Sequence, residues 1–369
     1  MAGFSTVSLM RESPEVVAKF AAYYRELGAE EALVYVDGPL GDLAGLEAPG
    51  LTLIATDADF WTALGVARPE GLEARQVAIY LAGLARARTE WLAVVDADEF
   101  VFGDRPVAEF LDRIPKDADS VSLPTAEAVW GPGDDIDAPF GSTFFRTRWS
   151  SDLAWRALRR PVYGAAGAFM RHGLLGHTMG KQFLRVGPQY TEIGNHDTKR
   201  GDAVITRRAS ALGLPKMYVG HFDAIGLARW TQKWRQRISR ETLTSKMAPV
   251  RQSQMDAIAA ALNSGDAAAV QGVLRVVGPA VQNRRGDGLR VPAQSVLKGR
   301  SAGRRTTLHS GEGRSVRCAS RREAVTVAGD QLTRLAPPTF RGRRGRQRAA
   351  AGQKRSMAPG CGRPPPSAR

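Results

Sequence analysis

The chain has 369 residues, which suffices for one large α/β domain or two ordinary ones, and 43% of them are hydrophobic, enough for a packed core. No stretch approaches the ~18 consecutive apolar residues that a membrane span needs, and the N-terminus lacks the basic and apolar regions of a signal peptide. We therefore expect no transmembrane segment and a cytoplasmic location.

The net charge of +15 is distributed unevenly along the chain. Residues 1–140 carry 10 Lys and Arg against 25 Asp and Glu, residues 141–285 carry 23 against 8, and residues 286–369 carry 19 against 4. The first 285 residues are thus neutral overall. Both cysteines, Cys318 and Cys361, also lie beyond residue 285, which excludes a disulfide framework or a thiolate metal site before that point.

The first hundred residues alternate strand and helix patterns, as parallel α/β folds do. A helix is predicted after Ser13, with Pro14 in its first turn and Gly28 at its end, and a second helix spans residues 72–88. Buried strands are predicted at residues 4–10, 32–36, 51–55, 91–95 and 120–123.

The pattern loosens over residues 125–200, where many Gly, Trp, Phe and Arg residues predict loops and short strands laid over a site. Helical patterns return at residues 224–242 and 251–276. Residues 286–369 are rich in Arg, Gly, Ser, Ala and Pro, which predicts a disordered basic tail. We therefore expect a folded domain over residues 1–285, followed by a separate tail.

The tail has two interpretations. Its Arg-Gly-Arg-Arg-Gly-Arg segment at residues 341–346 resembles an RNA-binding arm. The composition is also that of GC-rich DNA translated in a wrong frame. We favour a dispensable tail, and we do not expect nucleic acid as a partner.

The candidate site follows the fourth predicted strand, where Asp96 and Asp98 come directly after the apolar run 91–95. Ligands of open α/β sheets bind at the carboxyl ends of the strands. In an extended chain the two carboxylates would point to the same side, and oxygen ligands suit Mg²⁺ or Mn²⁺. Such a cation can bridge a diphosphate and neutralise the charge of a departing nucleoside diphosphate. The simpler alternative is an Asp-rich turn that closes the strand.

The Asp-Ala-Asp-Glu-Phe box at residues 96–100 resembles that of the bacterial family 2-type glycosyltransferases of the GT-A fold. The resemblance covers roughly residues 4–240, and further blocks that carry it are Val7–Glu12, Val34–Gly38, Gly194–His196 and His221–Asp223 with Lys233 and Arg235. It implies a GT-A-like, mostly parallel sheet flanked by helices, with C-terminal helices. It also implies metal-dependent hexosyl transfer, with inversion, from a nucleotide-sugar to a hydroxyl group of a glycan, lipid or other acceptor. We expect a UDP-sugar as the donor and Mn²⁺ or Mg²⁺ as the cofactor.

Several residues are predicted to bind the donor. Glu12 and Asp37 end the first and second strands, on the edge that also carries Asp96. Asp37 resembles the family's acidic residue near the nucleotide base, although an Asp-Gly turn is an equal alternative. Lys181 and Arg185 are candidates to clamp the diphosphate. A solvated basic face, or pairing with the acidic half of the chain, is the alternative for both.

Two histidines are candidates to complete the metal site that Asp96 and Asp98 begin. Neutral imidazole is a common metal ligand, and His196 and His221 both lie in blocks that resemble the family. Each could equally be an ordinary core or surface histidine.

Inversion requires a carboxylate base for the acceptor hydroxyl group. The candidates after the fifth predicted strand are Glu127, Asp134, Asp135 and Asp137, of which we favour Asp135. An ordinary polar loop is the alternative for the three aspartates.

Two other functions remain open. A haloacid-dehalogenase-type phosphatase or phosphotransferase would use Asp96 as its nucleophile, but Phe100 stands where that class usually has Thr or Val. A nucleic-acid-binding protein would use the tail together with Trp230, Trp234 and their basic neighbours, although the helical spacing of the tryptophans favours core packing. Peripheral membrane contact and the oligomeric state are left open.

Overall fold

The computed structural model of the chain describes residues 1–131, 134–142, 144–176, 178–239, 249–266, 269–270 and 273. The predicted domain boundary at residue 285 and the predicted tail therefore lie outside the described residues. Among the described helices, none combines the length and the apolar character that crossing a bilayer requires.

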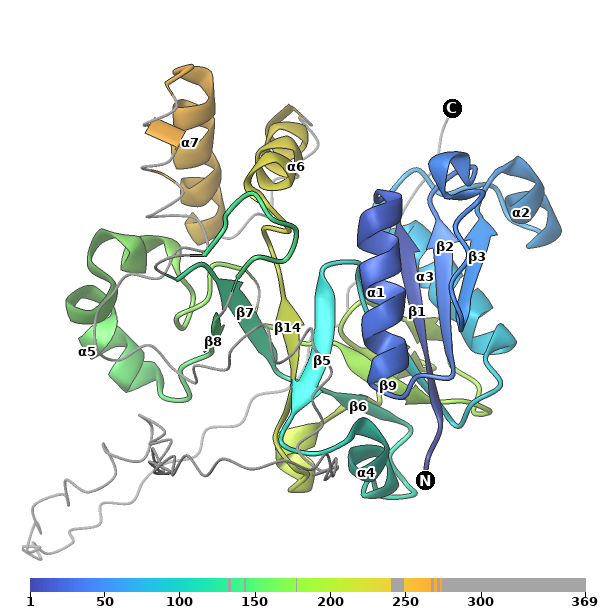
Figure 1. Cartoon of the computed structure of the whole chain (residues 1–369). Coiled ribbons are helices and arrows are strands. Elements are labelled where there is room, and N and C mark those ends of the chain that lie inside the picture. Colours follow the sequence, from blue (N-terminus) through green and yellow to red (C-terminus); the bar gives the residue numbers. More distant parts are fainter. Residues whose placement is uncertain are drawn as a thin grey trace, which may run out of the picture.

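A seven-stranded sheet in the order β13-β6-β9-β4-β1-β2-β3 forms the centre of the fold (Figure 1). Six of its strands run in one direction and β9 runs against them. This confirms the predicted α/β class with a mostly parallel sheet. The strands are β1 (Phe4–Met10), β2 (Glu31–Val36), β3 (Leu51–Ala55), β4 (Trp91–Val94), β6 (Ser120–Ser122), β9 (Gln182–Arg185) and β13 (Arg207–Arg208).

Two helices cover the opposite faces of this sheet, as its strand sequences require. Every residue of β1 and β4 is buried, which is typical of parallel strands with both faces covered. Val7 and Leu92 belong to a cluster with Ile79 of α3 (Leu72–Arg86), whereas Phe4 belongs to a cluster with Phe20 of α1 (Pro14–Glu26). Residues on the two faces of β1 thus pack in different clusters, each with its own helix.

The predicted ends of α1 are largely confirmed. Ser13 occupies the N-cap position and Pro14 the first turn, although the Ser13 side chain makes no capping hydrogen bond. Gly28 follows the helix with a φ of +98°, a backbone conformation that glycine adopts without a steric penalty.

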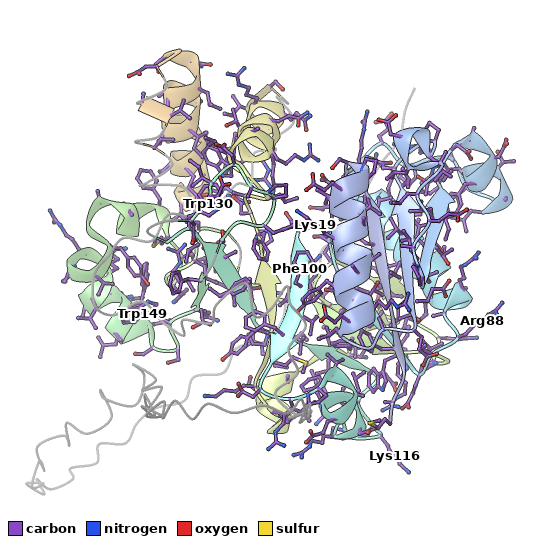
Figure 2. All side chains as sticks on the ribbon, viewed as in Figure 1. Lys19, Arg88, Phe100, Lys116, Trp130 and Trp149 are labelled. Atoms are coloured by element: carbon purple, nitrogen blue, oxygen red, sulfur yellow. The ribbon has the colours of Figure 1, made fainter. Side chains whose placement is uncertain are left out.

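A second, four-stranded sheet stands beside the first in the order β5-β14-β7-β8. Phe100 lies on the first strand in this order (Figure 2). Its ring contacts Phe20 and Tyr23 of α1, and it also contacts Phe140 and Phe222, which lie next to the second sheet. Phe100 therefore links the two sheets. The strands are β5 (Glu99–Gly103), β7 (Thr125–Val129), β8 (Phe144–Thr147) and β14 (Met217–His221).

The segment predicted as loops and short strands also contains a helix that the sequence pattern did not indicate, α5 (Asp152–Tyr163), which includes Pro161. At the C-terminal end, α6 (Leu227–Ser239) and α7 (Pro249–Asn263) pack through Trp230, Trp234 and Ile258, so both tryptophans are core residues. The remaining elements are α2 (Ala58–Ala63), α4 (Val107–Asp112), β10 (Glu192–Ile193), β11 (Thr198–Arg200), β12 (Ala203–Val204) and the short 3₁₀ helices Gly41–Leu43, Gly164–Phe169 and Ala209–Leu212.

The strand order creates a switch point between β1 and β4. From β1 the chain proceeds to β2 and β3 on one side, and then returns to β4 on the other. The carboxyl ends of these strands share one edge, the upper edge in Figure 1. In open α/β sheets, ligands bind in the crevice at such an edge.

Candidate functional site

The Asp-Ala-Asp box is a tight turn that carries the chain from the first sheet to the second. β4 ends at Val94, and the Glu99 backbone N–H donates to the Asp96 carbonyl oxygen at 3.1 Å. The Glu99 carboxylate in return accepts the Asp96 backbone N–H at 2.9 Å. The prediction that Asp96 and Asp98 point to the same side of an extended chain is therefore wrong, because the two aspartates lie in a turn and contact different partners. The turn and a ligand-binding role are compatible, because the turn fixes both carboxylates.

Asp96 belongs to a partly buried polar network at the sheet edge. Its carboxylate accepts a hydrogen bond from the Lys181 ammonium group at 2.8 Å and from the Gln76 amide at 3.2 Å. The Tyr80 hydroxyl group and the Asn195 side chain extend the network, with Tyr80 donating to Asn195 and Asn195 donating to Gln76, each at 2.8 Å. Asp96 is consequently held from α3 and from Lys181, the residue before β9.

Lys181 reaches Asp96 because the chain before it passes unusually close to β6. A side chain at Gly180 would place its Cβ 1.4 Å from the Leu123 carbonyl oxygen, so only glycine fits there. The Lys181 side chain is 2% exposed and lies 2.8 Å from Asp96 and 3.4 Å from Glu99. Burial alone would lower the pKa of Lys181, but the two carboxylates raise it above its ordinary value. Lys181 is thus a permanent buried cation.

Glu99 is the third acid of the turn and is almost fully buried. Burial raises its pKa to about 8, and the nearby Asp96 and Asp98 add to this effect, against the attraction of Lys181. Glu99 therefore acts inside the fold, where it holds the turn and faces Lys181, and it is not placed to contact a ligand.

Asp98 faces α6 and the end of β14. Its carboxylate lies 3.1 Å from the Lys233 ammonium group and 3.7 Å from Nε2 of His221. Burial alone would raise the pKa of Asp98, but Lys233 and then His221 outweigh it and hold the pKa below its ordinary value. The Phe222 backbone N–H also donates to the Asp98 carbonyl oxygen at 2.8 Å, which fixes the turn against β14.

Asp223 shares Lys233 with Asp98, and sequence reasoning did not assign it a role. Its carboxylate lies 3.2 Å from Lys233 and 3.8 Å from Arg237. Burial would raise the pKa of Asp223, but Lys233 and Arg237 hold it well below its ordinary value. The His-Phe-Asp block around residue 222 was the only signal, and it gave no indication that a helix cation would bridge Asp223 to Asp98.

The side chains of Asp98 and His221 suit a divalent cation. A carboxylate oxygen and an imidazole nitrogen lie side by side, and Mn²⁺ accepts both kinds of donor. Mg²⁺-type sites in phosphate-transferring proteins commonly use one or two carboxylates and complete the shell with substrate phosphates and water. Within the part of the chain that the structure describes, no group of three or more His, Cys, Asp or Glu side chains is arranged to hold a metal.

His196 lies on the Asp96 side of the turn. Its Nδ1 is 2.9 Å from the Gly180 carbonyl oxygen, next to Lys181, and burial lowers its pKa. It is placed to hold the chain before Lys181, whereas His221 is the histidine that the structure brings to Asp98.

Three cations at four-residue intervals on α6 face the acids at the strand ends. Arg229 pairs with Glu12, which follows β1, at 3.0 Å. Lys233 pairs with Asp98, and Arg237 with Asp223. Residues four apart lie on one face of a helix, so α6 presents a row of positive charge to the edge of the sheets.

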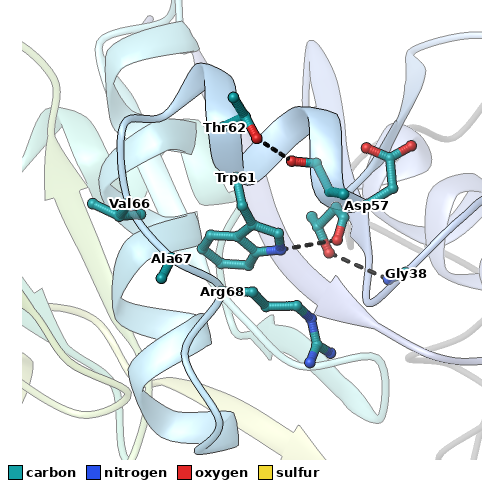
Figure 3. A pocket seen from close by; sticks show the side chains of 9 residues that line it. Gly38, Asp57, Trp61, Thr62, Val66, Ala67 and Arg68 are labelled. Carbon is teal, nitrogen blue, oxygen red and sulfur yellow. Dashed lines mark hydrogen bonds between the residues drawn. The ribbon is translucent and has the colours of Figure 1, made fainter.

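Asp37 follows β2 as predicted and carries two arginine partners. Its carboxylate lies 2.7 Å from the Arg68 guanidinium group and 3.1 Å from that of Arg75. Beside it is a cavity of about 390 Å³ at the ends of β2 and β3, lined by Gly38, Thr56, Trp61 and Arg68 among others (Figure 3). The Trp61 indole N–H donates to the Thr56 carbonyl oxygen at 2.9 Å, which fixes the ring in the cavity wall.

The structure places Arg185 away from the other candidates. Strand β9 runs antiparallel to β4, so Lys181 precedes it at the carboxyl end of β4, and Arg185 pairs with Trp91 at the amino end. The Arg185 guanidinium group stacks 4.2 Å above the Trp91 ring and binds Glu90 at 2.6 Å. The direction of β9 therefore carries Arg185 to the edge opposite the one that holds Asp96 and Lys181, and its diphosphate contact stays a prediction.

Two of the four candidates for the catalytic base, Asp135 and Asp134, accept hydrogen bonds from the backbone of their own loop. Asp135 is exposed, and its carboxylate accepts the backbone N–H groups of Asp137 at 3.0 Å and Ala138 at 3.3 Å. Asp134 accepts the Gly131 backbone N–H at 2.7 Å. Both contacts are those of an ordinary polar turn.

Glu127 and Asp137 differ sharply in their surroundings. Glu127 is buried on β7, where it pairs with Arg146 at 2.6 Å and accepts the backbone N–H groups of Leu175 and Gly176 at 2.8 and 2.6 Å. Asp137 is exposed and lines a second cavity, of about 320 Å³, between the loop after β1 and the start of α6.

Comparisons with known proteins give structural similarity without sequence matches. No protein-family model and no curated protein matches the chain. A solved mycobacterial protein is 14% identical over 78% of each chain, with a TM-score of 0.30. S. aureus TarS 1-349 in complex with UDP-GlcNAc is 11% identical over 74% of this chain and 81% of its own, with a TM-score of 0.27. GalNAc-T7 with UDP, GalNAc and Mn²⁺ is 10% identical over 81% of this chain and 56% of its own, with a TM-score of 0.33.

Proposed function

We propose that this chain is a metal-dependent glycosyltransferase of the GT-A type that takes its sugar from a nucleotide-sugar donor. The observation that carries the proposal is the arrangement at the end of β4, where Asp96 and Asp98 each pair with a lysine and His221 lies beside Asp98. This arrangement stands at the switch point of the sheet, where open α/β folds bind their ligands.

Charge at this edge suits a diphosphate. The Lys233 ammonium group lies 3.1 Å from Asp98 and the Lys181 ammonium group lies 2.8 Å from Asp96, so each of the two acids is paired with a cation. Asp98 and His221 would hold Mn²⁺ or Mg²⁺, which when bound supplies a Lewis acid for the negative charge of the departing nucleoside diphosphate. Lys233 is 25% exposed and can donate to a phosphate oxygen, whereas the buried Lys181 acts by fixing Asp96.

Asp37 and the cavity beside it suit the nucleoside part of the donor. Arg68 and Arg75 hold the Asp37 carboxylate in one orientation, and a carboxylate retains acceptor capacity after two such contacts. It can accept a hydrogen bond from a base N–H or a ribose hydroxyl group. We infer a UDP-sugar as the donor, on the resemblance of the Val34–Gly38 block.

The proposed transfer inverts the anomeric centre, with a hydroxyl group of a glycan, lipid or other acceptor attacking from the side opposite the diphosphate. It requires one carboxylate base within hydrogen-bond reach of that hydroxyl group. The candidates from the sequence are Glu127, Asp134, Asp135 and Asp137, and their surroundings differ.

Thermal-shift measurements on the full chain test this function. We expect at least one member of a panel of UDP-, GDP- and dTDP-sugars to raise the melting temperature, and to do so more strongly with Mn²⁺. A ligand at 100 times its Kd stabilises the folded state by about 2.7 kcal/mol, which such a measurement detects. If no pair of donor and metal shifts the melting temperature at saturating concentration, the proposal fails.

A further inference from the structure

We propose that the cavity between the loop after β1 and the start of α6 binds the acceptor, and that Asp137 is the base that takes the proton of its hydroxyl group. The inference rests on the proposed function, because it assigns the acceptor side of the same site. The acceptor class is a polyhydroxylated molecule such as a sugar.

The lining of this cavity suits hydroxyl groups. It encloses about 320 Å³, and its described lining includes the side chains of Arg11, Glu12, Asp137 and Arg229. Carboxylates accept hydrogen bonds from hydroxyl groups and guanidinium groups donate to them, so a sugar finds both kinds of partner there.

The cavity adjoins the proposed diphosphate site along α6. Arg229 pairs with Glu12 in the cavity wall, and Lys233 pairs with Asp98. Glu12, which the sequence predicts to bind the donor, is thereby assigned to the acceptor side. The two cations are four residues apart, which is about 6 Å along the helix axis at the α-helical rise. A molecule in the cavity therefore lies next to a sugar whose diphosphate is held at Asp98.

The loop that carries Asp137 is fixed against the start of α6. The Leu227 backbone N–H donates to the Ile136 carbonyl oxygen at 2.8 Å, and the Phe140 backbone N–H donates to the Ile225 carbonyl oxygen at 2.7 Å. These two bonds flank Asp137 on either side. Its position on the cavity wall is therefore determined by backbone hydrogen bonds and does not depend on its own carboxylate.

A base needs carboxylate oxygens that are open to the substrate. Glu127 has both oxygens occupied by Arg146 and two backbone N–H groups, and Asp135 binds the N–H groups of its own turn. In the described part of the chain, no group hydrogen-bonds the Asp137 carboxylate, and Asp137 is an exposed residue that lines the cavity. Asp137 is consequently the candidate that lines a cavity and whose carboxylate can accept a proton from the acceptor.

The step balances without any further reactant. The acceptor oxygen attacks the anomeric carbon of the donor sugar, and the bond from that carbon to the diphosphate oxygen breaks, with the electron pair leaving on the nucleoside diphosphate. The acceptor proton passes to the Asp137 carboxylate and is later released to water. The same base can act on a water molecule, which gives slow donor hydrolysis in the absence of an acceptor.

Four variants test the assignment, each studied with the UDP-sugar and metal that stabilise the wild-type chain. Asp137→Asn removes the base, and Asp137→Glu keeps a carboxylate. Ala228→Trp fills the cavity from the exposed first turn of α6. Asp202→Asn is the control, because Asp202 is an exposed acid in the turn between β11 and β12.

Donor binding is followed by thermal shift, and turnover by UDP release in water alone and with methyl glucosides, galactosides and mannosides. We expect Asp137→Asn to bind the donor like the wild-type chain while kcat for UDP release falls about 10²- to 10⁴-fold. Asp137→Glu should recover part of the rate, Ala228→Trp should abolish acceleration by the glycosides, and Asp202→Asn should change neither readout.

Two results separate the inference from the function on which it rests. Undiminished UDP release by Asp137→Asn, in a chain that still binds donor, would overturn the base assignment alone. Acceleration by a glycoside that survives in Ala228→Trp would overturn the assignment of the cavity. Absence of donor binding by the wild-type chain would instead contradict the proposed function.

Discussion

Asp96 and Asp98 are two residues apart in the same turn, yet their side chains have different partners. Asp96 is held from inside the first sheet by a lysine that is 2% exposed, within a network that includes Gln76. Asp98 pairs with a lysine on α6 that is 25% exposed, and it lies beside His221. The Asp96 side therefore serves mainly to fix the turn, and the Asp98 side is available to exchange its partners for a ligand.

The largest expected effect concerns stability on the Asp96 side. Lys181→Met leaves Asp96 and Glu99 without their buried cation, and removing one partner of a buried pair costs about 3–5 kcal/mol. Urea denaturation measures this loss. Combining the substitution with Asp96→Asn should restore part of it, and a loss below about 1 kcal/mol in the single variant would contradict a fixing role for Lys181.

The corresponding change on the Asp98 side should affect binding more than stability. Lys233→Met removes a partly exposed cation, so we expect the free energy of unfolding to fall by only about 1 kcal/mol. Donor affinity should fall about tenfold, which corresponds to ~1.4 kcal/mol, because one donor to the diphosphate is lost. Titration calorimetry with the donor and Mn²⁺ measures this. Equal donor affinity of variant and wild type would remove Lys233 from the binding site.

The stability of the Asp96 side should also depend on pH. The pKa of Glu99 is raised from 4.5 to about 8, so the folded chain keeps a proton that the unfolded chain has already lost within this window. The contribution of Glu99 to stability is therefore full at low pH and is lost as the pH rises toward about 8. The free energy of unfolding of the wild type, relative to Glu99→Gln, should fall from pH 5 to pH 8. A difference that is constant over this range would show that Glu99 does not titrate there.

The smallest effect is expected at Arg185, which serves as the control for Lys233. Arg185→Ala removes a contact with Trp91 that is worth about 0.5–1 kcal/mol. Donor affinity should not change, because Arg185 lies at the amino end of β4. Weaker donor binding by this variant, in a chain that is still folded at the temperature of the measurement, would show that the donor does not bind at the carboxyl end of β4.

The strands that build the site could be predicted because their sequences carry the signal locally. β1 and β3 coincide with the predicted segments, and β4 ends one residue earlier than predicted. Runs of buried apolar residues reveal such strands, and the acids that follow them must lie at the same edge of a parallel sheet. The positions of Asp37 and Asp96 followed from this reasoning.

The partners of these acids depend on long-range pairing that local patterns do not encode. Lys181 and Arg185 are four residues apart, but the strand between them was not predicted, and its antiparallel direction sends them to opposite edges. Lys233 meets Asp98 only because α6 folds back over the turn. Glu127 was considered as a base because the sequence could not reveal that Arg146, on the neighbouring strand, would occupy it.

The central claim is that Asp98, with His221, binds a metal together with the diphosphate of a nucleotide-sugar, and one measurement tests it most directly. Titration calorimetry compares donor binding to the wild-type chain and to Asp98→Asn, each with and without Mn²⁺. We predict that Mn²⁺ strengthens donor binding by the wild type, and that Asp98→Asn remains folded but loses this strengthening. Equal strengthening by Mn²⁺ in both proteins, with both folded, would contradict the account.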